Sequence, residues 1–353
     1  MIHPRPSPIA AALYTLRDLE VDVIIMHGPA GCCFRTGRLL EDEGIRVLTT
    51  AMSENDFIFG AKEKLTNTIK EAYEAFHPEN MGIVGTCASM IIGENMRKAA
   101  KEADVDCNII VVETHGGFDA GDNTAGAILT LKAAEKSGII SKEEVERQSA
   151  MLRKATELEK TRGMAKGEYI KPDYGDNKVQ VAQKIIQALD DNKKVTIVLN
   201  AKKETSYLFA DIMTIPWTKI YPENTPTFIA NTDEKVGLPY IRHHAEEVNR
   251  TIDKQIDYTT GGLDEYPVTG IEAEKILKEL NSNITIIGVP HAVDPKEIPG
   301  KTIAVTDGPR LAKPLRELGF DNVITELDAH SKTLGSKTIV ESEFASTLRG
   351  LLE

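Results

Sequence analysis

Short apolar runs rich in β-branched residues alternate with segments of helical period along the first third of the chain. Four runs have the length of strands, at residues 21–26, 45–50, 81–85 and 108–112. Between the second and third runs, five apolar side chains fall on one helical stripe: Leu65, Ile69, Ala72, Tyr73 and Phe76. This alternation predicts βαβ units and an α/β fold with two to three Rossmann-like αβα domains and mainly parallel sheets.

The alternation stops near Ser141, where Ser141-x-x-Glu144 has the pattern of a capping box. A polar helix is expected to follow as far as about Thr161, and then a stretch with glycine and proline. Strand and helix patterns resume after residue 177. The expected domains are an N-terminal αβα domain at 1–140, a helical arm at 141–176, a middle α/β domain at 177–270 and a C-terminal α/β domain at 271–353.

Composition narrows the class of protein. The 353 residues are 41% hydrophobic and 27% charged, and no apolar run approaches the roughly 18 residues that span a bilayer. Prolines at positions 4, 6 and 8 would spoil a targeting helix, so we expect a cytoplasmic protein. The net charge of −12, without a basic block, argues against a nucleic-acid partner.

Four cysteines are present, too few for a disulfide framework, and none forms a Cys-x-x-Cys pair. Cys32 and Cys33 follow the first predicted strand, and Cys87 follows the third. Because ligands of α/β sheets bind at the carboxyl ends of the strands, we expect Cys32 and Cys87 at one edge of a sheet. A helix N-terminus beside a thiol would lower its pKa and favour metal binding.

The alternative for each cysteine is a small buried apolar side chain. We keep that interpretation for Cys107, which begins a strand and so lies at the opposite edge. Adjacent side chains usually diverge, so one of Cys32 and Cys33 is expected to face the site and the other the interior. Whether Cys33 takes the place of Cys32 stays open.

The other motifs in the sequence do not identify a nucleotide site or a catalytic residue. The turn at residues 28–31 is not a dinucleotide fingerprint, and a Walker A motif is missing, so any ATP hydrolysis is expected from another protein. His115 lies in a turn after the fourth strand that either contacts a ligand or only caps a helix. His291 and His330 follow predicted strands of the last domain, and we assign neither a role. The catalytic residues are unknown at this stage.

Three segments together resemble the nitrogenase component 1 superfamily: His27-Gly28-Pro29-x-Gly31-Cys32, Ser53-Glu54-Asn55-Asp56-Phe57-Ile58-Phe59-Gly60 with Lys64-Leu65, and Gly85-Thr86-Cys87-x-x-x-Ile91-Ile92-Gly93-Glu94-Asn95. The opening His3-Pro4-Arg5-Pro6-Ser7-Pro8 and the short length are most similar to its branch of Ni-sirohydrochlorin a,c-diamide reductive cyclases. The specific motifs cover about the first third of the chain.

The resemblance implies an iron–sulfur cluster at a subunit interface, held at the positions of Cys32 and Cys87. The third cysteine found upstream in nitrogenase is missing here, which favours a 4Fe-4S centre over an eight-iron one. Such a cluster usually takes four protein ligands. A two-fold homodimer would supply them as two cysteines from each chain.

The resemblance also implies a partner and a substrate. A separate NifH-like iron–sulfur reductase, which binds ATP-Mg, would pass electrons through the cluster to a bound nickel tetrapyrrole. Ring reduction would be coupled to lactam closure in the biosynthesis of the nickel coenzyme of methanogenesis.

Two arginines near the first cysteine loop are candidate contacts for the carboxylates of such a substrate. Arg35 and Arg38 have the planar fork that suits a carboxylate, and the alternative for both is a solvated helix face. Two other classes of function stay open. One is a non-catalytic scaffold for cluster or cofactor assembly, and the other is a cluster-free α/β binding protein with inert cysteines.

Overall fold

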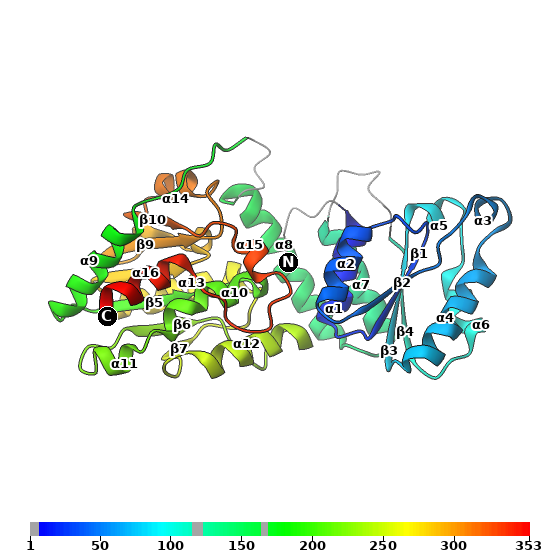
Figure 1. Cartoon of the computed structure of the whole chain (residues 1–353), viewed down its shortest axis with the longest axis horizontal. Coiled ribbons are helices and arrows are strands. Elements are labelled where there is room, and N and C mark those ends of the chain that lie inside the picture. The colour runs from blue at the N-terminus through cyan, green and yellow to red at the C-terminus, as the bar shows by residue number, and fades with distance from the viewer. Residues whose placement is uncertain (1–6, 115–122, 164–168) are drawn as a thin grey trace. The chain divides into compact units, whose positions relative to one another are not determined.

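The structure is a computed structural model that describes residues 7–114, 123–163 and 169–353. The opening motif up to Pro6 and the turn at His115 lie outside the described residues. The chain divides into two compact units, which we call the N-terminal unit (2–153) and the C-terminal unit (154–353). Figure 1 labels their elements.

The N-terminal unit has a four-stranded parallel sheet in the order β2-β1-β3-β4. Its strands are β1 (Val23–His27), β2 (Arg46–Thr49), β3 (Asn80–Gly85) and β4 (Asn108–Val112). Its helices are α1 (Pro8–Asp18), α2 (Phe34–Asp42), α3 (Glu54–Phe59), α4 (Lys62–Phe76), α5 (Cys87–Ile91), α6 (Met96–Ala103) and α7 (Asn123–Lys136). Every residue of β1 is buried because helices cover both faces of the sheet.

The predicted stripe on α4 is confirmed for most of its length. Leu65, Ile69 and Ala72 are buried and pack with β1, β3 and α6 in one core. Phe76 departs from the prediction, since 41% of it is exposed. It stands in the last turn of the helix, with the guanidinium of Arg46 on β2 5.9 Å from the centre of its ring.

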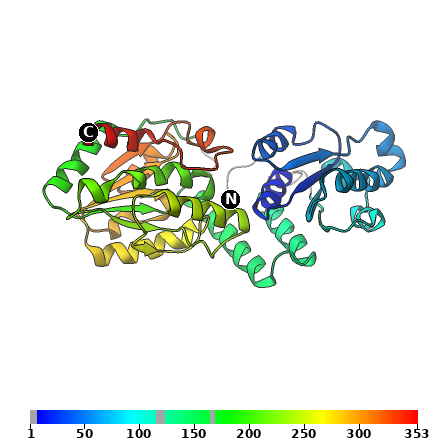
Figure 2. The same ribbon diagram turned by 60° about the horizontal axis from the view of Figure 1, so that its bottom comes forward.

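The C-terminal unit has a six-stranded parallel sheet in the order β10-β9-β8-β5-β6-β7. The strands are β5 (Val195–Leu199), β6 (Thr227–Ala230), β7 (Tyr258–Thr259), β8 (Ile284–Gly288), β9 (Lys301–Thr306) and β10 (Asn322–Thr325). The helices are α9 (Lys178–Asp190), α10 (Lys203–Phe209), α11 (Trp217–Ile220), α12 (Pro239–Thr251), α13 (Tyr266–Leu280), α14 (Ala312–Leu318), α15 (Ala329–Thr333) and α16 (Glu343–Leu352), with short 3₁₀ turns η1 (Ala210–Thr214), η2 (Pro290–Ala292) and η3 (Pro295–Glu297). Figure 2 shows this sheet between helices.

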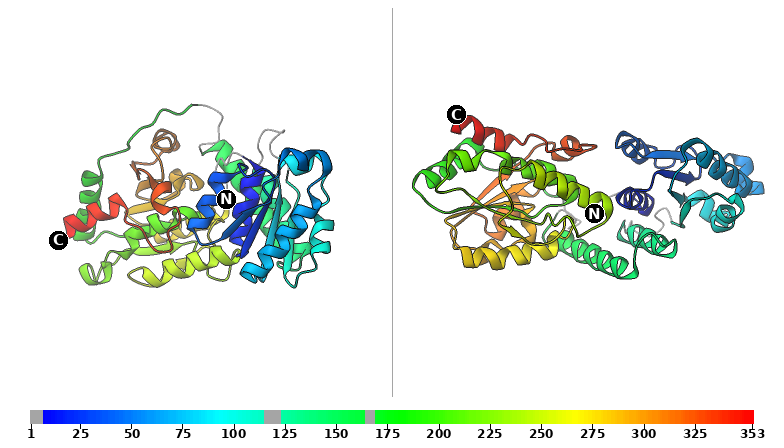
Figure 3. Two further views of the ribbon diagram at one scale, coloured as in Figure 1. Left: turned by 45° about the vertical axis from the view of Figure 1, so that its right-hand side comes forward. Right: turned by 90° about the horizontal axis from the view of Figure 1, so that it is seen from below.

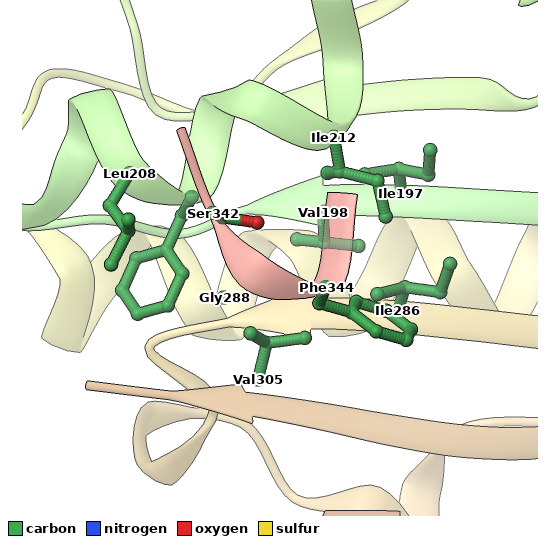
Figure 4. Close-up of a pocket in the computed structure, with 10 residues that line it drawn as sticks. Ile197, Val198, Leu208, Ile212, Ile286, Gly288, Val305, Ser342 and Phe344 are labelled. Atoms are coloured by element: carbon green, nitrogen blue, oxygen red, sulfur yellow. The ribbon is translucent and has the colours of Figure 1, made fainter. Parts of the chain in front are cut away.

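Alternate side chains of this sheet pack on opposite faces. Val198 of β5 packs with α13 and α14 in one core. Its neighbour Ile197 faces the other side, where a small apolar pocket lies between the sheet, α10 and Phe344 of α16 (Figure 4). On that side α9 and α16 lie side by side (Figure 3).

The predicted α/β class with parallel sheets is confirmed in both units. The expected middle and C-terminal domains correspond to two stretches of one sheet, because β5 pairs with β6 on one side and with β8 on the other. The polar helix α8 (Lys142–Thr161) begins in the N-terminal unit and ends in the C-terminal unit. Among the described residues, no helix has the length and apolar character needed to cross a membrane.

Candidate functional site

The cysteine loops leave the N-terminal sheet at its topological switch point. From β1 the chain moves outward to β2 and then returns to the other side of β1 to form β3. His27 and Gly85, the last residues of β1 and β3, are paired in register. Cys32 lies in the turn after β1, and Cys87 is the first residue of α5. A switch point is where open α/β sheets bind their ligands.

One close backbone contact holds the two loops together. A Cβ placed on Gly28 would meet Thr86 Oγ1 at 2.1 Å, so only glycine fits at this position. Thr86 Oγ1 donates a hydrogen bond of 3.0 Å to the His27 carbonyl, and the Thr86 N–H donates another of 3.2 Å to the same oxygen. The loop that carries Cys87 is therefore fixed against the loop that carries Cys32.

The thiols are half-buried, and none forms a disulfide. Burial and the neighbouring Cys87 raise the pKa of Cys32, and a hydrogen bond with Thr86 only partly opposes them. Burial likewise raises the pKa of Cys33, against a hydrogen bond with Ser7. The expectation of a lowered thiol pKa is wrong for these two residues, because burial raises the pKa of both.

Cys33 lies nearer the other thiols than the sequence indicated. Cys32 and Cys87 both raise its pKa, so all three thiols share one electrostatic environment. Cys33 caps α2 in a left-handed conformation, with φ at +49°. Cys107 instead precedes β4, at the amino edge of the sheet, and packs against the core.

Arg35 and Arg38 are exposed on α2, just after the cysteine turn. The Arg38 guanidinium donates a hydrogen bond of 2.8 Å to Glu41, one turn further along the helix. The structure therefore leaves open both the substrate-binding interpretation and the solvated-face interpretation of these arginines.

Large exposed apolar side chains stand on the helices at the carboxyl edge of this sheet, and the sequence analysis did not single them out. We call them the apolar rim, and they stand on helices that follow β1, β2 and β3: Phe34, Phe57, Ile58, Phe59 and Ile91. Phe59 is the last residue of α3, the helix that follows β2, and is 85% exposed. A cluster of exposed apolar side chains is typical of an interaction surface. The signal available in the sequence was the apolar run from Phe57 to Phe59, which follows a predicted strand.

The donor set fits an iron–sulfur cluster better than a single metal ion. Thiolates are the protein ligands of such clusters. Within the described ranges, no three side chains of His, Cys, Asp or Glu converge to hold a metal ion. Around Gly31 a Cβ would meet nothing within 4 Å, so there is open space beside Cys32. One chain thus offers thiols and space without a complete ligand set.

The pocket in the C-terminal unit is lined almost wholly by apolar residues, unlike the cysteine loops. It has no thiol and only one polar side chain, Ser342, among the residues that line it (Figure 4). We interpret it as a packing gap on the face of the sheet.

The chain is similar in sequence to several known proteins. Residues 7–156 match the family model of nitrogenase component 1 type oxidoreductases. Over 352 residues the chain is 57% identical to the Ni-sirohydrochlorin a,c-diamide reductive cyclase complex component CfbD of Methanothermobacter thermautotrophicus, covering 99% of this chain and 98% of that protein. The CfbD component of Methanocaldococcus jannaschii is 48% identical over 362 residues, with 100% of both chains covered. A solved structure of nitrogenase Cp1 at pH 6.5 aligns with 14% identity and a TM-score of 0.39, over 99% of this chain and 88% of that one.

Proposed function

The chain belongs to the family of CfbD, a component of Ni-sirohydrochlorin a,c-diamide reductive cyclase complexes. From this membership we propose that it is the catalytic component of such an enzyme, which binds the tetrapyrrole and reduces and cyclises it. The proposal includes a 4Fe-4S cluster and an ATP-hydrolysing NifH-like reductase as the electron source. The observation that carries it is the pair of thiol loops at the switch point of a sheet in a chain so similar to CfbD over its whole length.

Cys32 and Cys87 would hold the cluster, with Cys33 as the neighbouring thiol. When bound, a 4Fe-4S cluster supplies one-electron transfer at low potential. The Thr86 side chain lies beside Cys32 and lowers its pKa, which favours the thiolate that the cluster requires. Half-burial of the thiols limits the access of water and oxidants to them.

A homodimer would complete the ligand set. Two copies related by a two-fold axis supply the same loops twice, so that two thiols from each chain give four ligands. The apolar rim supports this arrangement, because burial of exposed apolar side chains between two copies is favourable.

Arg35 and Arg38 would contact the carboxylates of the tetrapyrrole. Both guanidinium groups are exposed on α2, and an arginine can form two parallel hydrogen bonds to one carboxylate. In this proposal the arginines orient the substrate.

The test is anaerobic reconstitution. Purified chain with its cluster, the NifH-like reductase, ATP-Mg and Ni-sirohydrochlorin a,c-diamide should give reduced, cyclised product, with no product when the reductase or ATP is omitted. The chain alone should not hydrolyse ATP. A protein that carries its cluster but gives no product with an active reductase would favour the scaffold function. A protein without iron after anaerobic preparation would contradict both.

A further inference from the structure

Thr86 lies between the two cysteine loops, and its hydroxyl group is a candidate for a role beyond packing. It directly precedes Cys87 as the N-cap residue of α5, and its side chain is completely buried. Its Oγ1 and Cγ2 atoms lie 2.1 Å and 2.7 Å from the position that a Cβ would take on Gly28. Because Gly28 approaches both branches of the side chain, the oxygen is held in place. The hydroxyl proton can still turn about the C–O bond.

A tight turn brings Cys32 back towards the same threonine. The Cys32 N–H donates a hydrogen bond of 3.0 Å to the carbonyl of Pro29, the residue after Gly28. The first and last Cα atoms of such a turn lie within about 7 Å of each other. Burial and Cys87 raise the pKa of Cys32, whereas the Thr86 side chain lowers it, as a hydroxyl does when it lies beside a sulfur. Thr86 is therefore beside one proposed ligand in space and beside the other in sequence.

The acceptor of the Thr86 hydroxyl has a second donor. The hydroxyl donates to the His27 carbonyl at 3.0 Å, and the Thr86 N–H donates to the same carbonyl at 3.2 Å. That N–H also lies 2.9 Å from Ser89 Oγ, which further fixes the start of α5. If the hydroxyl proton turned away, the His27 carbonyl would keep a backbone donor, so no buried acceptor would be left unpaired. The direction of the hydroxyl proton is therefore not required by the fold.

We propose that the Thr86 hydroxyl turns its proton from the His27 carbonyl to the sulfur of Cys32 when that sulfur is a cluster ligand. This inference rests on the proposed function, which supplies the 4Fe-4S cluster and Cys32 as its ligand. The thiolate is the stronger acceptor, because hydrogen bonds to an ionised group are about twice as strong as those between neutral groups. Thr86 is then a positioning residue that acts on the cluster through Cys32.

Such a hydrogen bond changes how readily the cluster accepts an electron. Reduction adds negative charge, part of which lies on the sulfurs. A donor at one sulfur stabilises the reduced form and makes the reduction potential more positive, since hydrogen bonds to the sulfurs are among the factors that set this potential. The hydroxyl would therefore help the chain to accept electrons from the reductase, at Cys32 of each copy in a homodimer.

The test is a redox titration of the anaerobically prepared protein, monitored by electron paramagnetic resonance of the reduced cluster. Thr86→Val keeps the shape of the side chain and removes the hydroxyl. We expect this variant to favour the oxidised cluster about tenfold more than wild type, a shift of about 59 mV to more negative potential for one electron. Thr86→Ser keeps the hydroxyl and should stay close to the wild-type potential.

A second measurement detects the proton itself. In D₂O, electron–nuclear double resonance of the reduced cluster should show a deuteron coupling in wild type and in Thr86→Ser that is missing in Thr86→Val. A methyl group cannot exchange its protons with solvent, so this difference reports the hydroxyl and not the packing around it. If Thr86→Val does not retain iron, Thr86→Ala takes its place, with the same expected shift and the same missing coupling.

The matched control is Thr114→Val. Thr114 follows β4 and is also buried, and its hydroxyl donates to the Gly85 carbonyl at 2.7 Å. The variant therefore loses the same kind of hydrogen bond, from a buried threonine to the end of β3. It should keep the wild-type potential and the deuteron coupling.

The outcomes separate this inference from the proposed function. If the cluster is present and Thr86→Val keeps the wild-type potential and coupling, the inference is wrong and the proposed function stands. A potential in Thr86→Ser as negative as in Thr86→Val, or an equal shift in Thr114→Val, would assign the change to packing and overturn the inference as well. Wild-type protein without iron after anaerobic preparation would contradict both proposals.

Discussion

Thiol chemistry at the switch point of the N-terminal sheet depends on the surroundings of single residues. Burial keeps the pKa values of Cys32 and Cys33 above the usual range, so the cluster-free protein carries these thiols protonated. Metal binding must displace those protons, since the thiolate is the ligand.

The cysteines give the first prediction. Cys32→Ser and Cys87→Ser should each abolish iron binding, because serine does not replace a soft thiolate ligand. Cys107→Ser should keep its iron, since Cys107 packs against the core at the opposite edge. Iron and acid-labile sulfide are measured after anaerobic purification. Full iron content in the Cys87 variant would overturn the assignment, and loss of iron only in Cys33→Ser would move the ligand one position along.

The second prediction concerns substrate contacts. Arg35→Ala and Arg38→Ala should weaken tetrapyrrole binding about tenfold, near the lower value for a hydrogen bond between charged groups, without loss of iron. Arg38→Ala should have the smaller effect because Arg38 already pairs with Glu41. Spectrophotometric titration measures the change, with Arg46→Ala, at the amino edge of the same sheet, as control. Unchanged affinity in both variants would leave these arginines as a solvated helix face.

At the scale of elements, the short helix α3 carries Phe57, Ile58 and Phe59 of the apolar rim. A charged side chain, Asp56, caps its first turn. The Asp56 carboxylate accepts hydrogen bonds from Lys64 Nζ at 2.8 Å and from the Ser53 N–H at 2.6 Å. The bonds from Lys64 and Ser53 lower the pKa of Asp56 to about 2. This capping fixes the first turn of the helix that carries the exposed Phe57 and Phe59.

A third prediction follows for Asp56. Its pKa is lower in the folded state, so its stabilisation of α3 is complete above about pH 4 and disappears as the pH falls through 2. Lys64→Met should raise the pKa of Asp56 towards its ordinary value by removing the largest cause of the shift. The pKa of Asp56 in each chain is measured from its carboxyl chemical shift by NMR across the pH range. An unchanged titration in Lys64→Met would show that Ser53 alone is responsible.

The fourth prediction tests the contact between the two cysteine loops. Gly28→Ala should push Thr86 away and lower stability by about 1–3 kcal/mol, the usual cost of overpacking, with loss of iron. Gly31→Ala, in the same turn, should be tolerated because its Cβ would meet nothing within 4 Å. Thermal melting and iron content are compared for the pair. Equal behaviour of the two variants would mean that the close approach at Gly28 is unimportant.

Much of the fold could be predicted from the sequence because its signals are local. The buried run of β1 and the stripe on α4 each reflect the periodicity of one element. The position of Cys33 could not be predicted, because it depends on a left-handed residue in a turn that lacks a glycine there. Nor could the polar cluster of Glu159, Lys202, Tyr266 and His291 be predicted, because its members come from α8, the residue before α10, α13 and the turn after β8.

At the scale of the whole molecule, the number of thiol ligands that one chain offers to the cluster leads to a prediction of the oligomeric state. Within the part of the chain that the structure describes, one copy offers no complete ligand set, so we expect a homodimer with about four irons per two chains. Light scattering with iron quantitation measures both quantities. Because apolar burial contributes to the contact, Phe59→Asp should shift the protein towards monomers, whereas Leu351→Asp, a change at another exposed apolar residue, should not. A monomer with a complete cluster would contradict the shared site.

The contact between Gly28 and Thr86 also sets an order of events in the maturation of the protein. The two loops meet only after β1 has paired with β3, and that pairing rests on buried residues such as Ile25 and Ile83, which need no metal. We therefore expect the chain to fold before it receives iron, unlike small zinc domains that are unfolded without their ion. Chain made in iron-poor medium should accumulate as a folded precursor, ready to be matured when iron and sulfide arrive.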